Sequence, residues 1–179
     1  QTLQHLVSSP ALDETSVYFF VGQRMYAADR VTGSMKWEKP LEVGGIVDAT
    51  PVITGGKAIF GCRDGRVYFV DTKTGVKTGE FNTVAKHKGA AKPPPDASTS
   101  ANVQSSPLYH DGKIYVGTDN GWVYALDFES GERIWQFRTK GAVKATPAYW
   151  NHGVFVASLD GHVYGLQADT GRLMWRTTL

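Results

Sequence analysis

Residues 105–137 read SSPLYHDGKIYVGTDNGWVYALDFESGERIWQF, and this stretch decides the fold because the chain repeats it. Residues 145–177 read ATPAYWNHGVFVASLDGHVYGLQADTGRLMWRT, and residues 49–81 read ATPVITGGKAIFGCRDGRVYFVDTKTGVKTGEF. A looser copy, SSPALDETSVYFFVGQRMYAADRVTGSMKWEK, occupies residues 8–39. Self-similarity at a fixed period is the signature of a repeat architecture, so four copies of one structural unit are predicted.

The period of the repeat is close to 40 residues. A Ser/Thr-Pro pair opens each copy, with the prolines at positions 10, 51, 107 and 147. The first and last intervals agree within a residue, whereas the middle interval is longer and contains an insertion at residues 82–102. The units are therefore expected at approximately residues 6–43, 46–84, 103–141 and 143–179, within a single segment 1–179.

Each copy is expected to form four short strands, as residues 105–137 illustrate. The first strand starts at Pro107, since proline is tolerated at the first residue of a strand. Asn120-Gly121 supplies the positive φ that a tight hairpin turn needs, so it separates a strand at 113–118 from one at 122–127. A fourth strand follows at 133–139. Short strands separated by turns, repeated every 40 residues or so, predict the four-stranded antiparallel blades of a β-propeller, which is an all-β fold.

The turn between the third and fourth strands resembles a motif of a known family. Propellers of PQQ-dependent alcohol dehydrogenases carry a tryptophan-docking motif, A-x-D-x-x-T-G-x-x-x-W. The first repeat matches it at Ala27, Asp29, Thr32, Gly33 and Trp37. The third repeat matches it, with serine for threonine, at Ala125, Asp127, Ser130, Gly131 and Trp135. The fourth keeps Thr170, Gly171 and Trp175, and the second keeps Asp71, Thr74 and Gly75 but has Gly79 at the tryptophan position.

The chain thus resembles the quinoprotein-like (PQQ-type) repeat proteins over most of its length. Its compact, regular repeats look more like the non-enzymatic members, such as the BamB-type outer-membrane assembly lipoproteins. The resemblance implies that Trp37, Trp135 and Trp175 are structural residues that dock one blade on the next. Because Gly79 replaces the tryptophan of the second repeat, we expect the contact between the second and third blades to be the loosest.

The resemblance also bears on the number of blades, because propellers of this type usually have eight. Four copies either close as a ring of four or form half of a ring of eight. We favour the half-ring, since its outer blades expose apolar faces that a second half would cover. Self-association or a protein partner is therefore expected.

One position after the central turn of each repeat varies in chemistry, and it holds Arg24, Arg66, Trp122 and His162. Two interpretations are open. The residues are either tolerant, solvent-facing turn residues, or a mixed cationic and aromatic ring around the central channel that binds an anionic or planar ligand. We favour the first, because loop residues carry function often but not usually.

The insertion at 82–102 is the other irregularity. Lys86 and Lys88 make it basic, and three consecutive prolines at 93–95 favour an extended polyproline geometry. A loop without buried area is one interpretation, and a partner-binding or lid segment is the other.

Composition narrows the class of protein. The formal net charge of +2 does not indicate a nucleic-acid partner, and no apolar run is long enough to span a membrane. No histidine spacing suggests a metal site, and the single cysteine, Cys62, cannot form the vicinal cysteine pair of the PQQ dehydrogenases.

Two function classes follow. The first is a non-catalytic propeller that binds a protein or ligand in the cell envelope, periplasm or extracellular space, with no cofactor. The second is a fragment of a quinone-dependent dehydrogenase, with PQQ and calcium, whose catalytic residues lie outside this segment.

Overall fold

The computed structural model describes residues 8–84 and 101–178, and every regular element in these ranges is a β-strand. The strands form four antiparallel sheets of four strands each. Blade 1 contains β1 (Ala11–Leu12), β2 (Ser16–Val21), β3 (Arg24–Asp29) and β4 (Leu41–Glu42). Blade 2 contains β5 (Val52–Thr54), β6 (Lys57–Gly61), β7 (Arg66–Asp71) and β8 (Lys77–Asn82). Blade 3 contains β9 (Leu108–His110), β10 (Lys113–Gly117), β11 (Trp122–Asp127) and β12 (Arg133–Arg138). Blade 4 contains β13 (Ala148–Trp150), β14 (Gly153–Ser158), β15 (His162–Gln167) and β16 (Leu173–Thr178).

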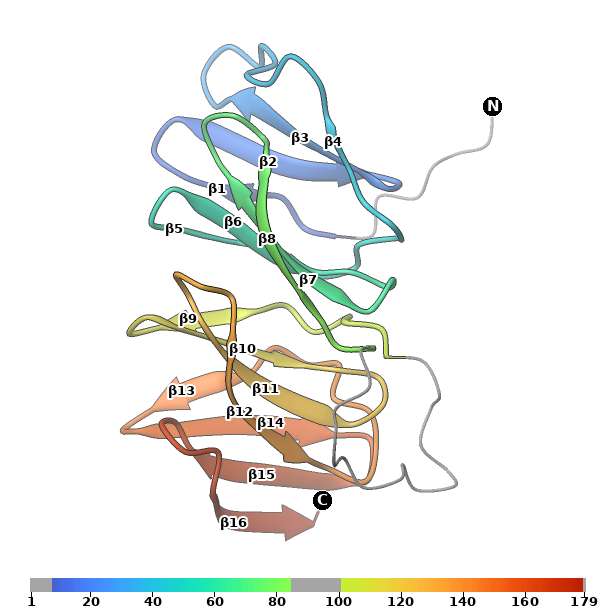
Figure 1. Cartoon of the computed structure of the whole chain (residues 1–179), viewed down its shortest axis with the longest axis vertical. Helices are drawn as coiled ribbons and strands as arrows, with labels where there is room; N and C mark the ends of the chain where they lie inside the picture. Colours follow the sequence, from blue (N-terminus) through green and yellow to red (C-terminus); the bar gives the residue numbers. More distant parts are fainter. Residues whose placement is uncertain (1–7, 85–100, 179) are drawn as a thin grey trace.

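The predicted β-propeller fold is confirmed. Within each blade the strands pair in chain order, so each blade is a meander of three hairpins. The strands expected in the third repeat are present, with β9 starting just after Pro107. The first strands of successive blades contact one another, so these four strands lie closest to the propeller axis. The blades stack in chain order as an open arc, with blades 1 and 4 at its opposite ends (Figure 1).

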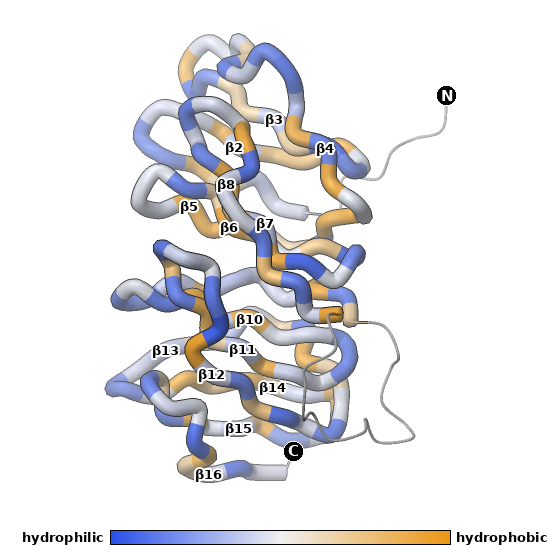
Figure 2. The backbone as a smooth tube through the Cα atoms, in the orientation of Figure 1, coloured by the Kyte–Doolittle hydropathy of each residue, from blue (hydrophilic) through white to orange (hydrophobic). Residues whose placement is uncertain are grey.

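The core lies between blades rather than inside one central cluster. Alternate residues of a strand point to opposite faces of the sheet, so the second and third strands of an inner blade contribute to two interfaces. Figure 2 shows apolar residues along these strands and hydrophilic residues in most turns. Blades 1 and 2 share one buried cluster that includes Tyr18, Phe20 and Phe60. A second cluster joins blades 2 and 3, and a third joins blades 3 and 4.

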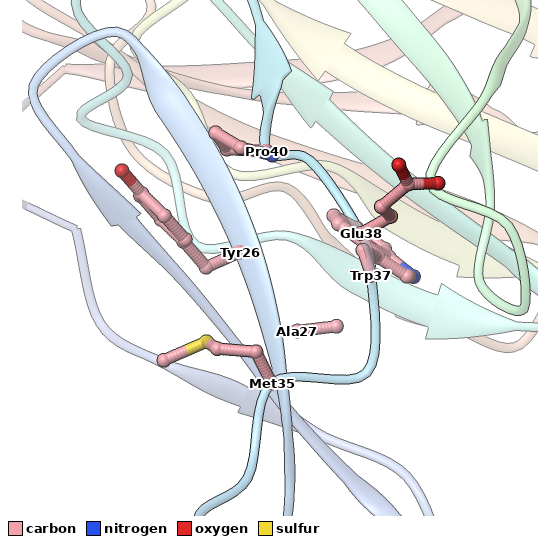
Figure 3. Close-up of a pocket in the computed structure, with 6 residues that line it drawn as sticks. All are labelled: Tyr26, Ala27, Met35, Trp37, Glu38 and Pro40. Atoms are coloured by element: carbon pink, nitrogen blue, oxygen red, sulfur yellow. The ribbon is translucent and has the colours of Figure 1, made fainter.

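Blade 1 departs from the regular pattern at its outer edge. Its fourth strand is reduced to the two residues of β4, because Pro40 has no N–H to donate to the sheet. The chain bulges between the bridge at Met35 and the start of β4. A small cavity of about 130 Å³ remains beneath the bulge, lined in Figure 3 by Tyr26, Ala27, Met35, Trp37, Glu38 and Pro40.

Within the described ranges there is no helix that could cross a membrane.

Candidate functional site

The turn between the third and fourth strands is held by one aspartate in blades 1, 2 and 3. In blade 1, Asp29 Oδ1 accepts hydrogen bonds from the N–H groups of Val31 (3.0 Å) and Thr32 (2.8 Å) and from the Thr32 hydroxyl (3.0 Å). Asp71 and Asp127 make the same set of bonds in their own blades. These bonds favour the ionised carboxylate, so they lower the pKa of all three aspartates.

Each of these turns ends in a glycine with φ near +70°. In blades 2 and 3 this glycine contacts an aromatic side chain of the preceding blade. Trp37 of blade 1 lies over Gly75 of blade 2, where a Cβ would stand 2.7 Å from the indole ring. Its Nε1–H donates to the carbonyl oxygen of Thr72 at 3.0 Å. A side chain at position 75 would collide with the indole, so glycine is required there by space as well as by φ.

The same contact joins blades 3 and 4. Trp135 lies over Gly171, and its Nε1–H donates to the carbonyl oxygen of Ala168 at 2.7 Å. Trp37 and Trp135 are each only 7% exposed. The structure therefore places both side chains as interblade contacts, with the buried indole N–H satisfied by a backbone carbonyl.

The contact between blades 2 and 3 has the large and small residues exchanged. Phe69 on β7 pairs with Gly79 on β8, at the place where Ala125 pairs with Trp135 in blade 3. The Phe69 ring is buried and lies 3.3 Å from the point where a Cβ on Gly131 would stand. The aromatic group that covers the next blade's glycine thus comes from the third strand instead of the fourth.

A lysine replaces the indole N–H at this same contact. Lys57 Nζ donates to the carbonyl oxygen of Phe128 at 3.1 Å, which corresponds to the carbonyls of Thr72 and Ala168. The ammonium also lies 4.4 Å from the centre of the Phe128 ring and 2.7 Å from Glu129 Oε2. Phe69 and Lys57 therefore fill the place that Gly79 leaves without a tryptophan, and the expectation that this contact is the loosest of the three stays a prediction. A shallow groove of about 490 Å³ remains at the outer rim, between β8 and the turn at 130–133.

Trp175 occupies the docking position of blade 4 but faces away from blade 3. It pairs with Gly165, stacks on Phe155 with 5.6 Å between ring centres, and is 44% exposed. It has the orientation of a docking tryptophan, and within the described residues no further blade stands over it.

The four variable positions after the central turns lie at the start of the third strand of each blade. The second strand separates them from the axis-side strand, so they lie away from the strands that line the axis. Arg24 pairs with Glu42 across the sheet at 2.9 Å, and both side chains are exposed. Arg66 contacts Asp64 at 3.3 Å and Glu80 at 3.2 Å.

Trp122 and His162 also interact within their own blades. The Arg138 guanidinium lies 4.8 Å from the centre of the Trp122 ring, and Trp122 packs against the cluster between blades 2 and 3. It is thus half-buried rather than a freely exposed turn residue. His162 Nδ1 lies 3.3 Å from Asp160 Oδ1. Each of the four side chains thus has its own set of partners, and these contacts do not bring the four together in one site.

The central turns and the interblade loops meet on one end of the molecule, which we call the loop face. The same backbone hydrogen bond occurs three times there, from Arg63 N–H to Ile46 C=O (3.0 Å) and at the two equivalent places. These are Asp119 N–H to Asn102 C=O (2.9 Å) and Leu159 N–H to Ala142 C=O (2.8 Å). Backbone hydrogen bonds fix the positions of these loops, so the side chains can differ from blade to blade without a change in the backbone.

The side chains of the loop face do differ in charge. Arg63 makes two hydrogen bonds to Asp48, at 2.6 and 2.9 Å. Asp119 is only 8% exposed, lies 3.9 Å from Lys144 Nζ, and has its pKa raised by burial. Leu159 is an exposed apolar residue, at 72%.

The sequence did not identify Arg63 or Leu159 as site residues, and Asp119 was interpreted as a turn residue. The three residues nevertheless occupy one aligned position of the repeat, which holds a cation, an anion and an apolar group.

The remaining candidates have simple placements. Cys62 is fully buried, and burial raises the pKa of its thiol to about 12, so it is a packing residue and not a nucleophile. In residues 8–84 and 101–178, no three His, Cys, Asp or Glu side chains gather as metal ligands. Lys86 and Lys88 lie outside the described residues.

Comparison with known proteins gives one family. The family model described as outer membrane protein assembly factor BamB matches residues 1–93 and 83–179. BamB of Vibrio cholerae is 39% identical over 135 residues, covering 73% of this chain and 34% of that protein. The dehydrogenase subunit of the quinone alcohol dehydrogenase of Gluconacetobacter polyoxogenes is 31% identical over 134 residues, covering 64% and 17%.

Solved structures show the same fold. The crystal structure of BamB from Moraxella catarrhalis matches with a TM-score of 0.76 at 22% identity, over 97% of this chain and 53% of that chain. Quinohemoprotein alcohol dehydrogenase from Comamonas testosteroni matches with a TM-score of 0.80 at 16% identity, over 98% and 35%. The chain thus spans about half of the one and a third of the other.

Proposed function

This chain belongs to the BamB-like family of PQQ-type repeat β-propellers, and we propose that it is a non-catalytic scaffold that binds protein partners in the cell envelope. One observation carries the proposal: the loop face has a constant backbone and variable side chains. A rigid framework that displays varied loop residues is the usual way in which a repeat fold forms a binding surface.

The chemistry of the loop face fits a protein surface. It presents the Asp48–Arg63 pair, the half-exposed Lys144 and the exposed Leu159 within one row of loops. Mixed charge beside an apolar residue is suited to a polar rim and an apolar contact of a protein interface. The 39% identity to a protein named as an outer membrane protein assembly factor supports the same class of partner and the same compartment.

The second candidate is a piece of a quinone-dependent dehydrogenase, favoured by the 31% identity to such a subunit. PQQ and calcium would need several oxygen donors in one place. The described residues do not fit such a group, because their acidic side chains cap separate turns, as Asp29, Asp71 and Asp127 do. We therefore propose that this segment holds no cofactor of its own.

A site-specific photocrosslinker tests the scaffold proposal. Placed at Leu159 on the loop face, it is expected to give a discrete protein adduct in intact envelopes, because this side chain is open to a partner. Val76 is the matched control, being 60% exposed on the turn at the opposite end of blade 2. Adducts of equal yield from both positions would contradict a loop-face site.

Titration with PQQ and calcium separates the two candidates. The scaffold proposal expects unchanged tryptophan fluorescence and no dye-linked alcohol oxidation. Saturable quenching at stoichiometric PQQ would favour the dehydrogenase segment instead.

A further inference from the structure

One cross-strand pair of side chains joins the third and fourth strands of each blade next to the loop face. In blade 1 the pair is Arg24 and Glu42, which form an ion pair at 2.9 Å. In blade 2 the cation of the pair, Arg66, lies 3.3 and 3.2 Å from two carboxylates. In blade 3 the pair is Trp122 on β11 and Arg138, the last residue of β12. The cation of blade 3 thus has an aromatic ring where the cation of blade 1 has a carboxylate.

Arg138 is a cation without a counter-ion in the part of the chain that the structure describes. Its Nη2 is buried and has no hydrogen-bond acceptor within residues 8–84 and 101–178. Burial lowers the pKa of the Arg138 guanidinium, and the phenol of Tyr124 opposes this shift. A guanidinium stays protonated in a protein, so a positive charge remains there. A buried donor without an acceptor costs free energy, and an incoming acceptor would remove that cost.

Packing and backbone contacts hold the Arg138 side chain in place. Its guanidinium lies 4.8 Å from the centre of the Trp122 ring, and Trp122 packs against the cluster between blades 2 and 3. The hydroxyl of the next residue, Thr139, donates to the carbonyl oxygens of Gly121 and Gly141 at 2.9 and 2.8 Å. A side chain that is held in this way loses little conformational freedom when it binds, so the contact is preorganised.

The Arg138 side chain can be reached from outside, because it is half-buried and not closed off. It lies at the end of β12, directly before the interblade loop that leads to blade 4. A negative charge beside a partly buried, ring-packed cation interacts more strongly than it would at an open surface. A planar guanidinium also matches a carboxylate in shape, since the two groups can form a pair of parallel hydrogen bonds.

We propose that Arg138, packed on the Trp122 ring, donates hydrogen bonds to the carboxylate of an aspartate or glutamate side chain of the protein partner. This inference rests on the loop-face function proposed above, and it adds the chemistry of one contact. The contact lies on the outermost strand of blade 3, so the binding surface extends from the row of Arg63, Asp119 and Leu159 to the rim of the propeller.

Titration of the purified chain with a hexaglutamate peptide tests this chemistry without knowledge of the partner. In proton–nitrogen NMR correlation spectra, the indole N–H signal of Trp122 should shift saturably, while that of the interblade residue Trp37 should stay in place. Arg138→Gln should weaken the binding by about tenfold or more, because it removes the charge and the fork of donors. A shift that persists in Arg138→Gln, or the absence of any shift in the parent chain, would overturn the proposal.

Inorganic phosphate at the same ionic strength distinguishes a carboxylate site from a general anion site. We expect phosphate to leave the Trp122 signal unmoved, since a single guanidinium balances the charge of one carboxylate. An equal shift with phosphate would contradict the assignment to an acidic side chain.

Crosslinking from Leu159 separates this inference from the loop-face function. Arg138→Gln should reduce the adduct by about tenfold or more, and Arg138→Lys by less, because lysine keeps the charge. Arg30→Gln is the matched control, since it removes the same charge from an exposed turn at the opposite end of blade 1. An adduct that is unchanged by Arg138→Gln would overturn the carboxylate contact and leave the loop-face function standing. The absence of any adduct from the parent chain would instead contradict the loop-face function itself.

A stability measurement distinguishes a binding role of Arg138 from a structural one. Arg138→Gln should leave the urea denaturation midpoint close to that of the parent chain. The contact with the Trp122 ring is lost, but a buried N–H without an acceptor is removed with it. A fall in the midpoint as large as that of Trp135→Ala would show that Arg138 supports the fold, and it would overturn the proposal.

Discussion

The tryptophans differ in what covers them, although the sequence aligns them. Trp37 and Trp135 are 7% exposed and donate to a carbonyl of the next blade, while Trp175 is 44% exposed. Trp122 is not part of the docking motif, yet it is half-buried under Arg138. Sequence position gives the type of contact, and the presence of a neighbouring blade decides how much each contact stabilises the fold.

Trp135→Ala is expected to lower the free energy of unfolding by about 3–5 kcal/mol, because it leaves a void between blades 3 and 4. Trp135→Phe keeps most of the ring and loses the hydrogen bond to Ala168, at a cost of about 1–2 kcal/mol. Trp122→Ala is expected to fall between a surface and a core change, at about 1–2 kcal/mol, rather than to be neutral as the repeat alignment suggested. The urea denaturation midpoints of the three variants give their order of stability. Equal midpoints for Trp135→Ala and Trp122→Ala would contradict the assignment of Trp135 as the more strongly stabilising contact.

Buried tyrosines make stability fall at alkaline pH. Burial raises the pKa of Tyr68, Tyr124 and Tyr164 to about 12. The unfolded chain ionises its tyrosines near pH 10, so between pH 10 and 12 it binds fewer protons than the folded chain. This contribution to stability is complete below pH 10 and is lost as the pH rises toward 12. Absorbance at 295 nm should show these three phenols titrating late, and Tyr68→Phe should remove one of them.

Cys62 should react with a thiol reagent only when the chain unfolds. The side chain is fully buried, and burial raises its pKa to about 12. We expect negligible modification of the native chain at pH 8 and complete modification in denaturant. Fast reaction of the folded chain would show that the segment around Cys62, directly after β6, opens locally.

At the scale of elements, every interblade contact places an aromatic ring over the turn glycine of the next blade, although the strand that supplies the ring differs. The sequence shows Gly79 where a tryptophan is expected, and this position alone predicts a loose contact between blades 2 and 3. The compensating residues, Phe69 and Lys57, lie on two other strands of blade 2. No single repeat position reveals them, because the exchange depends on which side chains face one another across the sheet.

A double-mutant cycle tests the exchange of large and small residues. Phe69→Ala alone is expected to destabilise by about 3–5 kcal/mol, as for other buried aromatic residues. Adding Gly79→Trp to Phe69→Ala recreates the arrangement of blades 1 and 3 and should recover part of the loss. Gly79→Trp beside the intact Phe69 should gain little, so the two changes are coupled. Additive effects would mean that Phe69 does not replace the docking tryptophan.

At the scale of the whole molecule, the sequence predicts the repeats and the blade order because each blade is built from local hairpins. It does not predict the outer edge of blade 1, where the bulge around Pro40 shortens β4 to two residues. The loop-face pair of Asp119 with Lys144 joins residues from different repeats, so it requires the stacked blades to be seen.

A linear stack should also lose its structure from the ends. Each blade contacts only its neighbours, so the outer blades are held on one side. We expect amide exchange in the 179-residue chain to be fastest in β16 and β4 and slowest in β6 and β10. Uniform protection across all four blades would indicate a single cooperative unit.

The backbone hydrogen bonds that fix the loop face carry a consequence for the evolution of this chain. The N–H of Arg63, Asp119 or Leu159 is present whatever side chain the residue carries, proline excepted. Natural variation at the exposed positions 63 and 159 can therefore proceed at little cost to folding, and blades 2 and 4 each offer an independently mutable position in one shared row. A library randomised at 63 and 159 should retain the fold while its recognition properties diverge, which makes this face a ready starting point for selecting new specificities.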